Sequence, residues 1–256
     1  AKYRFTENLI ADIGVGRTIR RPEVTRLVGI INIKDEKETI SIANPGLLPE
    51  YAERVAGSVA YYFGGTNNLT LTLTDTKIEN LFVSDELTAE EFGLDDPSRA
   101  DYIVRTTRNS DDAVRFRSME LSYRHMLHFL PGPLQGTSVF VNYTRTYASE
   151  RRPGITPHLV STGFDWRYKR GGFGLKAVWI DDAPWTNTAG RIREGNVKFD
   201  GNLDFRISRR LTAFVQARNI TNVDHVVYEA LDGYEPVLWR RENYGANYVF
   251  GLRGSF

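Results

Sequence analysis

Residues 196–221 read NVKFDGNLDFRISRRLTAFVQARNIT, and apolar residues alternate with polar ones along most of this stretch. In the first run the apolar positions are Val197, Phe199, Leu203, Phe205 and Ile207, and the positions between them include Lys198, Asp200, Asn202, Asp204 and Arg206. In the second run Leu211, Ala213, Val215 and Ala217 alternate with Thr212, Phe214, Gln216 and Arg218. A period of two is typical of a β-strand with two unlike faces. Because only residues 208–210 separate the runs, the stretch predicts a tight antiparallel hairpin.

The same alternation recurs along the chain and predicts about ten strands in all. The other strands are expected near residues 7–20, 51–63, 68–82, 113–129, 137–148, 158–169, 172–181 and 244–256. Tight turns are expected at Gly64 and Gly65, at residues 131–133, and around Gly171 and Gly172, because glycine and proline favour turns. No linker, repeat or low-complexity segment interrupts the 256 residues, so we expect one all-β domain.

The lengths of the predicted connections alternate. Short connections fall near residues 64–67, 130–136, 169–172 and 208–210, and long polar ones near 21–49, 84–111, 183–195 and 222–243. The connection near 149–157 departs from this order, because it is short but falls among the long ones. Short turns at one rim and long loops at the other are typical of an antiparallel, up-and-down outer-membrane β-barrel. A soluble β-sandwich has no reason to sort its loops in this way.

The composition neither requires nor excludes a membrane. The chain is 41% hydrophobic, its mean hydropathy is -0.38, and no apolar stretch is as long as a transmembrane helix. A transmembrane barrel contacts lipid with only every second residue, so such averages report it poorly. The net charge of +1 gives no reason to expect nucleic acid as a partner. The absence of cysteine excludes disulfides and thiolate metal sites.

The polar faces of the predicted strands are strongly charged. Arginine and aspartate at consecutive positions cannot form a dry core, since unpaired buried charges cost several kcal/mol each. Such a face suits a wide lumen that is filled by water or by a plug. Aromatic residues gather near the predicted strand ends, which is typical of girdles at the two lipid–water interfaces. They are Tyr61, Phe63, Tyr143, Tyr147, Phe164, Trp166, Tyr168, Trp179, Tyr244 and Tyr248. Ordinary packing of aromatics within a sheet is the alternative, and the sorted loops favour the girdles.

Five stretches resemble, in the right order, the C-terminal half of the β-barrel of a TonB-dependent outer-membrane receptor of the proteobacterial type. They are GVGRTIRRPEVTRL (14–27), NPGLLPEYAERVAGSVAYYF (44–63), SMELSYRHMLHFLPGPLQGTSVFVNYTRTYA (118–148), LDFRISRRLTAFVQARNITN (203–222) and YGANYVFGLRGSF (244–256). The second resembles the Asn-Pro-x-Leu-x-Pro-Glu segment of that family, the fourth its penultimate hairpin, and the fifth its closing strand.

The resemblance implies a fold and a parent function. A barrel of this family has twenty-two strands, so residues 1–256 are expected to be the C-terminal part of one, present as a fragment without the N-terminal plug domain and TonB box. The implied function is energised uptake of a large scarce nutrient, a carbohydrate or an iron chelate, across the outer membrane of a Gram-negative bacterium, with the C-terminus in the periplasm. The implied partners are outer-membrane lipid, the barrel-assembly machinery, the nutrient (a siderophore or an oligosaccharide), and the TonB complex through the missing N-terminal part. No catalytic residue, cofactor or metal is expected.

Three groups of residues are candidates for function. In the long loops, Trp185, Tyr234 and Trp239 are expected to stack on a sugar ring or a planar siderophore, and Arg191, Arg193, Arg240 and Arg241 to bind anionic groups. The alternative is that these side chains pack the loops against each other. Facing the lumen, Asp204, Arg206, Gln216, Arg218 and Arg253 are expected to contact the plug. In the closing strand, Tyr248, Phe250, Leu252 and the terminal Phe256 resemble the signal that the barrel-assembly machinery reads.

Other functions stay open at this point. His125 and His128 form an H-x-x-H pattern, but residues three apart on a strand point to opposite faces, so a shared metal ion is not expected. His158 and His225 are expected at the solvated surface. The acidic pairs Asp95–Asp96, Asp111–Asp112 and Asp181–Asp182 allow an enzyme of the omptin type, a ten-stranded barrel, if carboxylates face a histidine across its mouth. A soluble β-rich binding protein is the third possibility.

Overall fold

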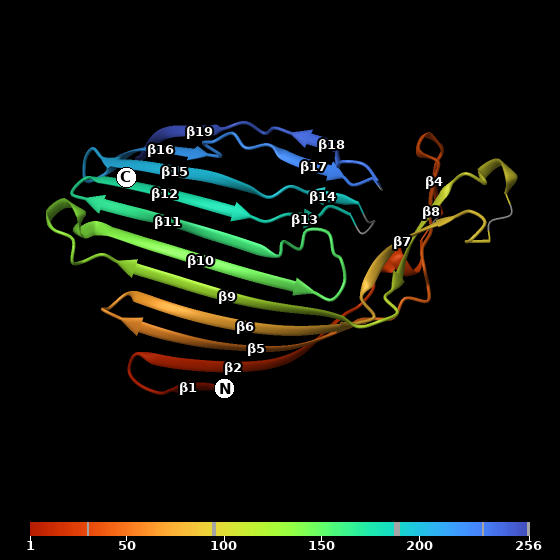
Figure 1. The fold of residues 1–256 in the computed structure, drawn as a ribbon, viewed down its shortest axis with the longest axis horizontal. Helices are drawn as coiled ribbons and strands as arrows, with labels where there is room; N and C mark the ends of the chain where they lie inside the picture. The colour runs from red at the N-terminus through yellow and green to blue at the C-terminus, as the bar shows by residue number, and fades with distance from the viewer. Residues whose placement is uncertain (30, 94–95, 187–189, 232, 255–256) are drawn as a thin grey trace. The chain divides into compact units, whose positions relative to one another are not determined.

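The structure is a computed structural model that describes residues 1–29, 31–93, 96–186, 190–231 and 233–254. Within these residues, eleven strands form one sheet in the order β1-β2-β5-β6-β9-β10-β11-β12-β15-β16-β19. Their bounds are β1 (Lys2–Arg4), β2 (Leu9–Arg20), β5 (Glu50–Phe63), β6 (Asn67–Glu79), β9 (Val114–Met126), β10 (Thr137–Ala148), β11 (His158–Tyr168), β12 (Gly171–Ile180), β15 (Asn196–Arg206), β16 (Leu211–Arg218) and β19 (Asn247–Gly254). Each strand lies beside the next one along the chain once the strands of the long links are set aside, as Figure 1 shows for β9 to β12.

The predicted all-β, antiparallel, up-and-down fold is therefore confirmed. The ten expected strands correspond to β2, β5, β6, β9, β10, β11, β12, β15, β16 and β19, with ends that differ by a few residues. In the described part of the chain, β1 and β19 lie at opposite ends of the strand order and do not pair with each other. This order contradicts a ten-stranded barrel that closes on itself. No helix in the described residues has the length and apolar character needed to cross a membrane.

The chain divides into two compact units. The first contains residues 1–14, 56–74 and 117–256, and the second contains residues 15–55 and 75–116. Strands β2, β5, β6 and β9 contribute residues to both units. Each unit is described by itself below.

The register of the first unit separates two faces of the sheet. Asp204 of β15 lies opposite Gly172 of β12 and Phe214 of β16, and Arg206 lies opposite Thr212, which in turn lies opposite Arg253 of β19. The residues between them form the other face, where Leu203, Phe205, Val215, Phe250 and Leu252 are exposed. An exposed apolar face opposite a charged face matches the alternation of the sequence.

The hairpin between β11 and β12 differs from the prediction. Its turn is Lys169–Arg170, and Lys169 has the positive φ of 51°, whereas Gly171 and Gly172 belong to the strand. Gly172 matters for packing instead of turning, because a Cβ atom on it would lie 2.5 Å from the Asp204 carboxylate. Gly174 is equally constrained, with the Asp165 carboxylate 2.7 Å from the position of its Cβ. Gly172 and Gly174 thus let acidic side chains of neighbouring strands lie flat over β12.

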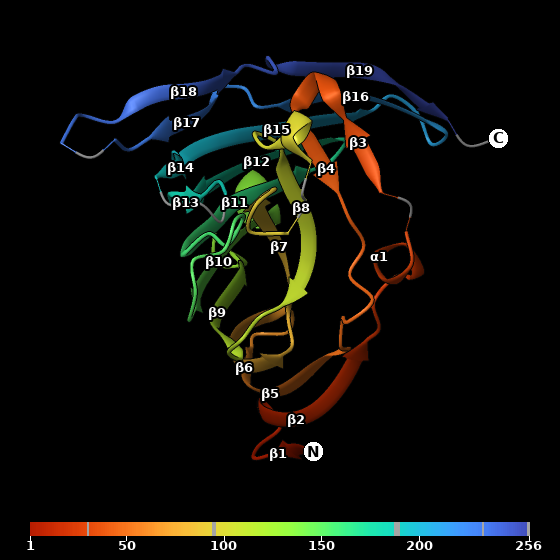
Figure 2. The ribbon, with the colours of Figure 1, turned by 90° about the vertical axis from the view of Figure 1, so that its right-hand side faces the viewer.

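All four predicted long loops contain more regular structure than expected. In the second unit, β3 (Asn32–Lys34), β4 (Thr39–Ser41), β7 (Phe82–Thr88) and β8 (Ile103–Asn109) form a sheet in the order β3-β4-β8-β7, in which β4 and β8 are parallel. In the first unit, β13 (Ala183–Pro184), β14 (Arg191–Arg193), β17 (His225–Glu229) and β18 (Val237–Glu242) form another sheet. The short helical elements are α1 (Val24–Leu27), η1 (Asp35–Lys37), η2 (Pro97–Arg99) and η3 (Gly132–Gly136). Figure 2 shows β7 and β8 side by side.

The NPGLLPE segment (44–50) is a structural element of the second unit. The Asn44 side chain accepts a hydrogen bond from the Gly46 N–H at 2.9 Å and donates one to the Thr107 carbonyl at 3.0 Å. Leu47 is buried, and so is the Glu50 side chain. One Glu50 oxygen accepts the Phe82 N–H at 2.6 Å, and the other lies 3.3 Å from Arg20. Asn44 and Glu50 thus fix the link to the strands on either side of it.

Candidate functional site

The predicted loop residues Trp185, Arg191, Trp239 and Arg240 meet on the sheet β13-β14-β17-β18. This sheet lies at the end of the first unit's strands that is opposite their short turns (Figure 1). In its register, Leu238 lies opposite Tyr228 and Arg240 opposite Val227, so Trp239 between them falls at an irregularity without a direct partner. A bulge of this kind turns a side chain away from the regular alternation.

The four side chains form a series with an arginine at each end and the two tryptophan rings between them. The Arg191 guanidinium carbon lies 4.3 Å from the centre of the Trp239 ring, and that ring lies 6.5 Å from the ring of Trp185. The Arg240 guanidinium carbon lies 5.6 Å from the centre of the Trp185 ring. Each such contact contributes about 0.5–1 kcal/mol at an exposed site. We call these four residues the Trp–Arg cluster.

The arginines of this region have partners within the protein. Arg191 forms an ion pair with Glu229 at 2.9 Å, and Arg240 forms one with Glu242. Arg193 lies apart from the cluster and donates to the Thr156 hydroxyl at 2.8 Å, and Arg241 is paired with Asp224. These pairs support the alternative in which the side chains hold the links together. Part of the cluster remains accessible, since Trp239 is 39% exposed.

Tyr234 is separate from the cluster. Its side chain is 79% exposed, and its N–H donates to the Leu231 carbonyl in a turn of the link between β17 and β18. Within the described residues, no ring contact places it against Trp185 or Trp239.

Two carboxylates, Glu242 at the end of β18 and Asp224 just before β17, are held in their ionised form. The Tyr244 hydroxyl donates to Glu242 at 2.8 Å, and this bond, followed by the contact with Arg240, lowers the pKa of Glu242. The same bond raises the pKa of Tyr244. The hydrogen bond from Asn243, followed by that from Arg241, lowers the pKa of Asp224.

The sequence predicted that His225 lies at the solvated surface, but the structure places its side chain partly buried among neighbours. Its Nε2 lies 2.8 Å from the Lys198 ammonium, and the Tyr244 ring packs edge-on against it at 5.4 Å. Burial lowers the pKa of His225, and the charges of Lys198 and Arg193 lower it further. His158 also has a partner, since its Nδ1 lies 2.8 Å from the Tyr143 hydroxyl. The alternation of residues 196–207 placed Lys198 on the charged face, but no signal in the sequence linked it to His225.

The five residues expected to face the lumen lie on one face of the sheet. The register places Asp204, Arg206, Gln216, Arg218 and Arg253 together on the charged face. The Arg253 guanidinium carbon lies 5.4 Å from the centre of the Phe214 ring on the same face. Near the short turns this face contains a cavity of about 500 Å³, which is lined by Asp204, Arg206, Gln216 and Arg253 among others, whereas Arg218 lies outside it. Whether a plug covers this face stays a prediction.

The closing strand places its aromatic residues on the apolar face. Phe250 is 81% exposed, and Tyr248 and Leu252 on the same face are exposed as well. Phe256, the fourth residue of the expected assembly signal, lies outside the described residues. The role of these residues in assembly stays a prediction.

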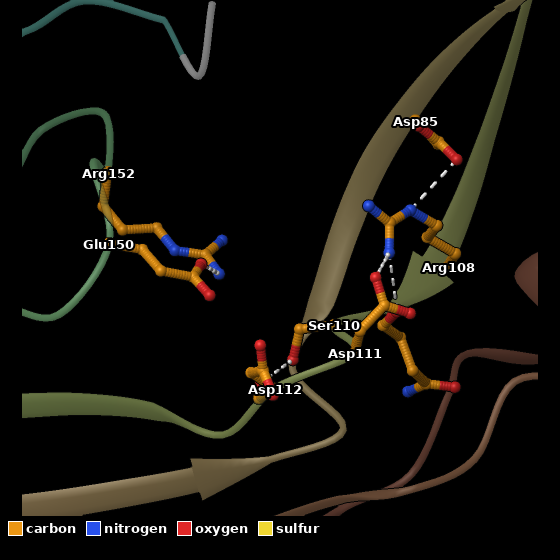
Figure 3. A network of polar contacts seen from close by, with 8 residues as sticks. Asp85, Arg108, Ser110, Asp111, Asp112, Glu150 and Arg152 are labelled. Atoms are coloured by element: carbon orange, nitrogen blue, oxygen red, sulfur yellow. Dashed lines mark hydrogen bonds and ion pairs between the residues drawn. The ribbon is translucent and has the colours of Figure 1, made fainter.

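Two of the acidic pairs have structural partners. Figure 3 shows Arg108 between Asp85 and Asp111, with 3.0 Å to each carboxylate. In the same figure the Ser110 hydroxyl donates to the Asp112 carbonyl, and Glu150 pairs with Arg152 in the first unit. Asp181 and Asp182 accept backbone N–H groups at 2.9 and 2.6 Å.

The third pair and the His125 pattern are also accounted for. Asp96 accepts hydrogen bonds from Ser98 and pairs with Arg99, and Asp95 lies outside the described residues. His125 bonds to the Tyr123 hydroxyl at 2.7 Å and packs edge-on against Phe63, while His128 lies beyond the end of β9. Across the described ranges, no three His, Cys, Asp or Glu side chains come together as a metal site requires.

Comparisons with known proteins add to this geometry. The model of the family described as TonB dependent receptor-like, beta-barrel matches residues 1–220. A mutant of the ferric enterobactin receptor PfeA from Pseudomonas aeruginosa is similar with a TM-score of 0.72 and 14% sequence identity, over 100% of this chain and 39% of that one. For the copper transporter OprC the values are 0.71 and 12%, over 100% and 39%. For the FrpB iron transporter from Neisseria meningitidis they are 0.64 and 14%, over 100% and 37%. No curated protein matches the chain. The chain thus spans less than half the length of each of these structures.

Proposed function

Because the chain belongs to the TonB-dependent receptor-like β-barrel family, we propose that it is the C-terminal part of the barrel of a receptor that takes up a scarce nutrient across the outer membrane of a Gram-negative bacterium. The exposed apolar face of the eleven-stranded sheet then contacts lipid, and the charged face lines the interior. The energy for uptake comes from the TonB complex through a part of the receptor that lies outside these residues. The proposed activity is binding and transport without a covalent step, so no catalytic residue is part of it.

The observation that carries the proposal at the level of a site is the Trp–Arg cluster. It lies on the links between strands, at the end of the sheet opposite the short turns, which is where the long loops of outer-membrane barrels face the outside. Two indole rings that are held in place by guanidinium groups form a rigid surface for stacking. The ligand is accordingly one with a flat or ring-shaped group, either a siderophore or an oligosaccharide.

The charges around the cluster bear on the choice of ligand. Arg191 and Arg240 each have a carboxylate partner, so the cluster presents little uncompensated charge. A ligand held here gains mainly from stacking and from hydrogen bonds to the paired groups. Among the similar structures, one is named as a ferric enterobactin receptor and another as a copper transporter.

The test is ligand binding by the full-length receptor. Purified receptor is titrated with a panel of ferric siderophores and, separately, with a panel of oligosaccharides, while heat and tryptophan fluorescence are recorded. We expect one panel to contain a ligand whose affinity falls about tenfold in Trp239→Ala, since an aromatic contact is worth about 1 kcal/mol or more. Trp239→Phe should retain most of the affinity. Trp179→Ala, a change on the apolar face of β12, is the matched control and should bind like the unchanged receptor. Equal binding by Trp239→Ala and Trp179→Ala would contradict this site.

A further inference from the structure

The second unit contains a cavity of about 490 Å³. Its lining comes from the segment that begins at α1 and from the strands β3, β4, β7 and β8 with the residues beside them. Every residue that lines it therefore belongs to the second unit, whereas the Trp–Arg cluster belongs to the first. We call it the second-unit cavity.

One face of the sheet β3-β4-β8-β7 forms the floor of this cavity. The register aligns one residue of each strand in a row across the sheet, in the order Asn32, Ser41, Arg105 and Glu86. Two positions along β7 and β8, Ser84 and Thr107 lie opposite each other on the same face. All of these residues line the cavity, so its floor is polar from one edge of the sheet to the other.

The opposite face of the same sheet is part of the core of the second unit. Ile40 precedes Ser41 on β4, Val104 precedes Arg105 on β8, and both apolar side chains are buried. An antiparallel or mixed sheet commonly packs one face on a core and leaves the other in water. The apolar face thus anchors the sheet, and the polar face is left to contact a ligand.

The segment that begins at α1 forms a wall of the cavity, through Thr25, Arg26 and Gly29. The Asn44 N–H donates to the Arg26 carbonyl at 2.8 Å, which joins this wall to the NPGLLPE segment. A Cβ atom on Gly29 would lie 2.9 Å from the Thr25 carbonyl oxygen, so the chain is closely packed there. These main-chain contacts hold the wall in place without using the Thr25 hydroxyl.

The charged residues of the cavity have partners, and the neutral polar ones do not. The ion pairs are Arg105–Glu86 at 3.0 Å, Arg26–Glu23 at 3.9 Å and Asp85–Arg108 at 3.0 Å. Within the part of the chain that the structure describes, hydrogen bonds are formed by none of the side chains of Thr25, Asn32, Ser41, Ser84 and Thr107. The cavity therefore combines compensated charge with unused hydroxyl and amide groups.

This combination indicates a neutral ligand that both donates and accepts hydrogen bonds. Serine and threonine hydroxyls can do both, and an ion pair such as Arg105–Glu86 presents donors beside acceptors. The neighbouring hydroxyl groups of a sugar have the same double character, so they match such a surface. An anion would gain little here, because a carboxylate already compensates each guanidinium group of the lining.

The shape of the floor favours an elongated ligand. From Asn32 on β3 to Glu86 on β7 the row crosses three strand spacings, about 14 Å at roughly 4.8 Å each. A peptide that adds to a sheet needs an unpaired strand edge. The strands in the middle of this floor, β4 and β8, are already paired on both sides. Among the described residues that line the cavity none is aromatic, so a ligand is held by hydrogen bonds instead of stacking.

We propose that the second-unit cavity binds a short stretch of a neutral glycan through its hydroxyl groups. This site goes beyond the proposed function, because it lies in the other unit and requires neither the Trp–Arg cluster nor transport. A free oligosaccharide and a chain of the polysaccharide on the cell's own surface offer the same chemistry. The experiment therefore includes both.

The experiment is a binding titration of the full-length receptor with Trp239→Ala, which weakens the Trp–Arg cluster. The probes are cellotriose, maltotriose and mannotriose, and separately the neutral surface polysaccharide of the source bacterium. We expect binding by at least one probe, with an affinity that changes less than about threefold between low and high salt, because a neutral ligand is not screened. Binding of a trisaccharide identifies a free sugar as the ligand, and binding of the polysaccharide alone identifies the surface chain.

Two results would overturn the proposal at this stage. One is that no neutral probe binds to a correctly inserted receptor. The other is that the receptor binds only an anionic glycan such as polygalacturonate, with an affinity that falls steeply as salt is added.

Hydroxyl variants assign the binding to this cavity. In Ser41→Ala/Thr107→Ala the affinity should fall about tenfold or more, as the loss of two hydrogen bonds predicts. The stability of the free receptor should be retained, since neither hydroxyl is bonded within the protein. Thr18→Ala removes a hydroxyl of β2 in the same unit but outside the cavity, and its affinity should stay within about twofold.

An unchanged affinity in Ser41→Ala/Thr107→Ala, or an equal loss in Thr18→Ala, would also overturn the proposal. None of these measurements depends on nutrient uptake or on the Trp–Arg cluster. A failure of the proposed transport function therefore gives a different result.

Discussion

The contacts of Glu50 explain why a glutamate ends the NPGLLPE segment. Its buried carboxylate accepts the Phe82 N–H and pairs with Arg20. We expect Glu50→Gln to lower the free energy of unfolding by about 1.5–3 kcal/mol, the usual loss of a charge-assisted hydrogen bond. The measurement is the midpoint of denaturant unfolding of the full-length receptor. Glu53→Gln removes an exposed partner of Arg17, and its effect should stay below about 1 kcal/mol. Equal effects of both changes would contradict this role for Glu50.

His225 gives the expected pH dependence at the residue scale. It is faced by Lys198, Arg193, Glu242 and the Tyr244 ring, and burial with the two cations lowers its pKa below the ordinary 6.5. The unfolded chain therefore binds the proton more readily than the folded one. The stability of the sheet β13-β14-β17-β18 should be complete above pH 6.5 and should fall as the pH drops below it.

The measurement is hydrogen exchange of the β17 amides in the full-length receptor at pH 7.5 and pH 5.5, corrected for the intrinsic rate. Protection should be weaker at the lower pH. In His225→Gln, which cannot be protonated, the two values should agree. A pH effect of the same size in His225→Gln would show that another group is responsible.

The sequence predicted which face a residue occupies better than it predicted the residue's neighbours. Period-two alternation placed Lys198, Asp204 and Arg206 on one face because strand geometry fixes that choice locally. The contacts of Lys198 with His225 and of Trp185 with Trp239 join segments far apart in the chain. Such contacts depend on the paths of long links, for which a single sequence contains little information.

At the scale of elements, Gly163 of β11 lies where a larger residue does not fit, because a Cβ atom there would be 2.3 Å from the Leu175 carbonyl oxygen of β12. We expect Gly163→Val to lower the yield of folded receptor and its stability by about 1–3 kcal/mol, because the backbone of β12 and the Phe140 ring must both shift. Gly14→Val in β2 is the control, since a Cβ atom there meets nothing within 4 Å. Folded yield is measured by the shift in gel mobility between unheated and heated receptor. The idea fails if Gly163→Val and Gly14→Val behave alike.

The long strands of the main sheet could be predicted, whereas the short strands of the links could not. Residues 196–206 alternate over enough positions to give a clear period, and the predicted range there matches β15 closely. Strand β14 is only Arg191–Arg193, and β4 is only Thr39–Ser41. Three residues do not establish a period, and charged or polar composition is typical of a loop. Pairing with a distant strand makes these segments extended, and that partner cannot be recognised locally.

At the scale of the whole molecule, the main sheet has one charged face and one apolar face. The charged face contains the cavity lined by Asp204, Arg206 and Arg253, and the apolar face contains exposed residues such as Phe205 and Phe250. In water such an apolar face would be a liability for aggregation. In a bilayer the same apolar face matches the hydrocarbon core. Antiparallel strands cross that core when they belong to a closed barrel.

The central claim is that β19 has lipid on one face and the interior of the barrel on the other. The most direct measurement places a nitroxide spin label at each position from Tyr248 to Arg253 of the full-length receptor in lipid bilayers. Collision rates are then recorded with oxygen, which enters lipid, and with a water-soluble nickel complex. We predict maxima for oxygen at Tyr248, Phe250 and Leu252, with minima at Val249, Gly251 and Arg253. Oxygen accessibility that is uniform along the strand, or that is highest at Gly251 and Arg253, would contradict the account.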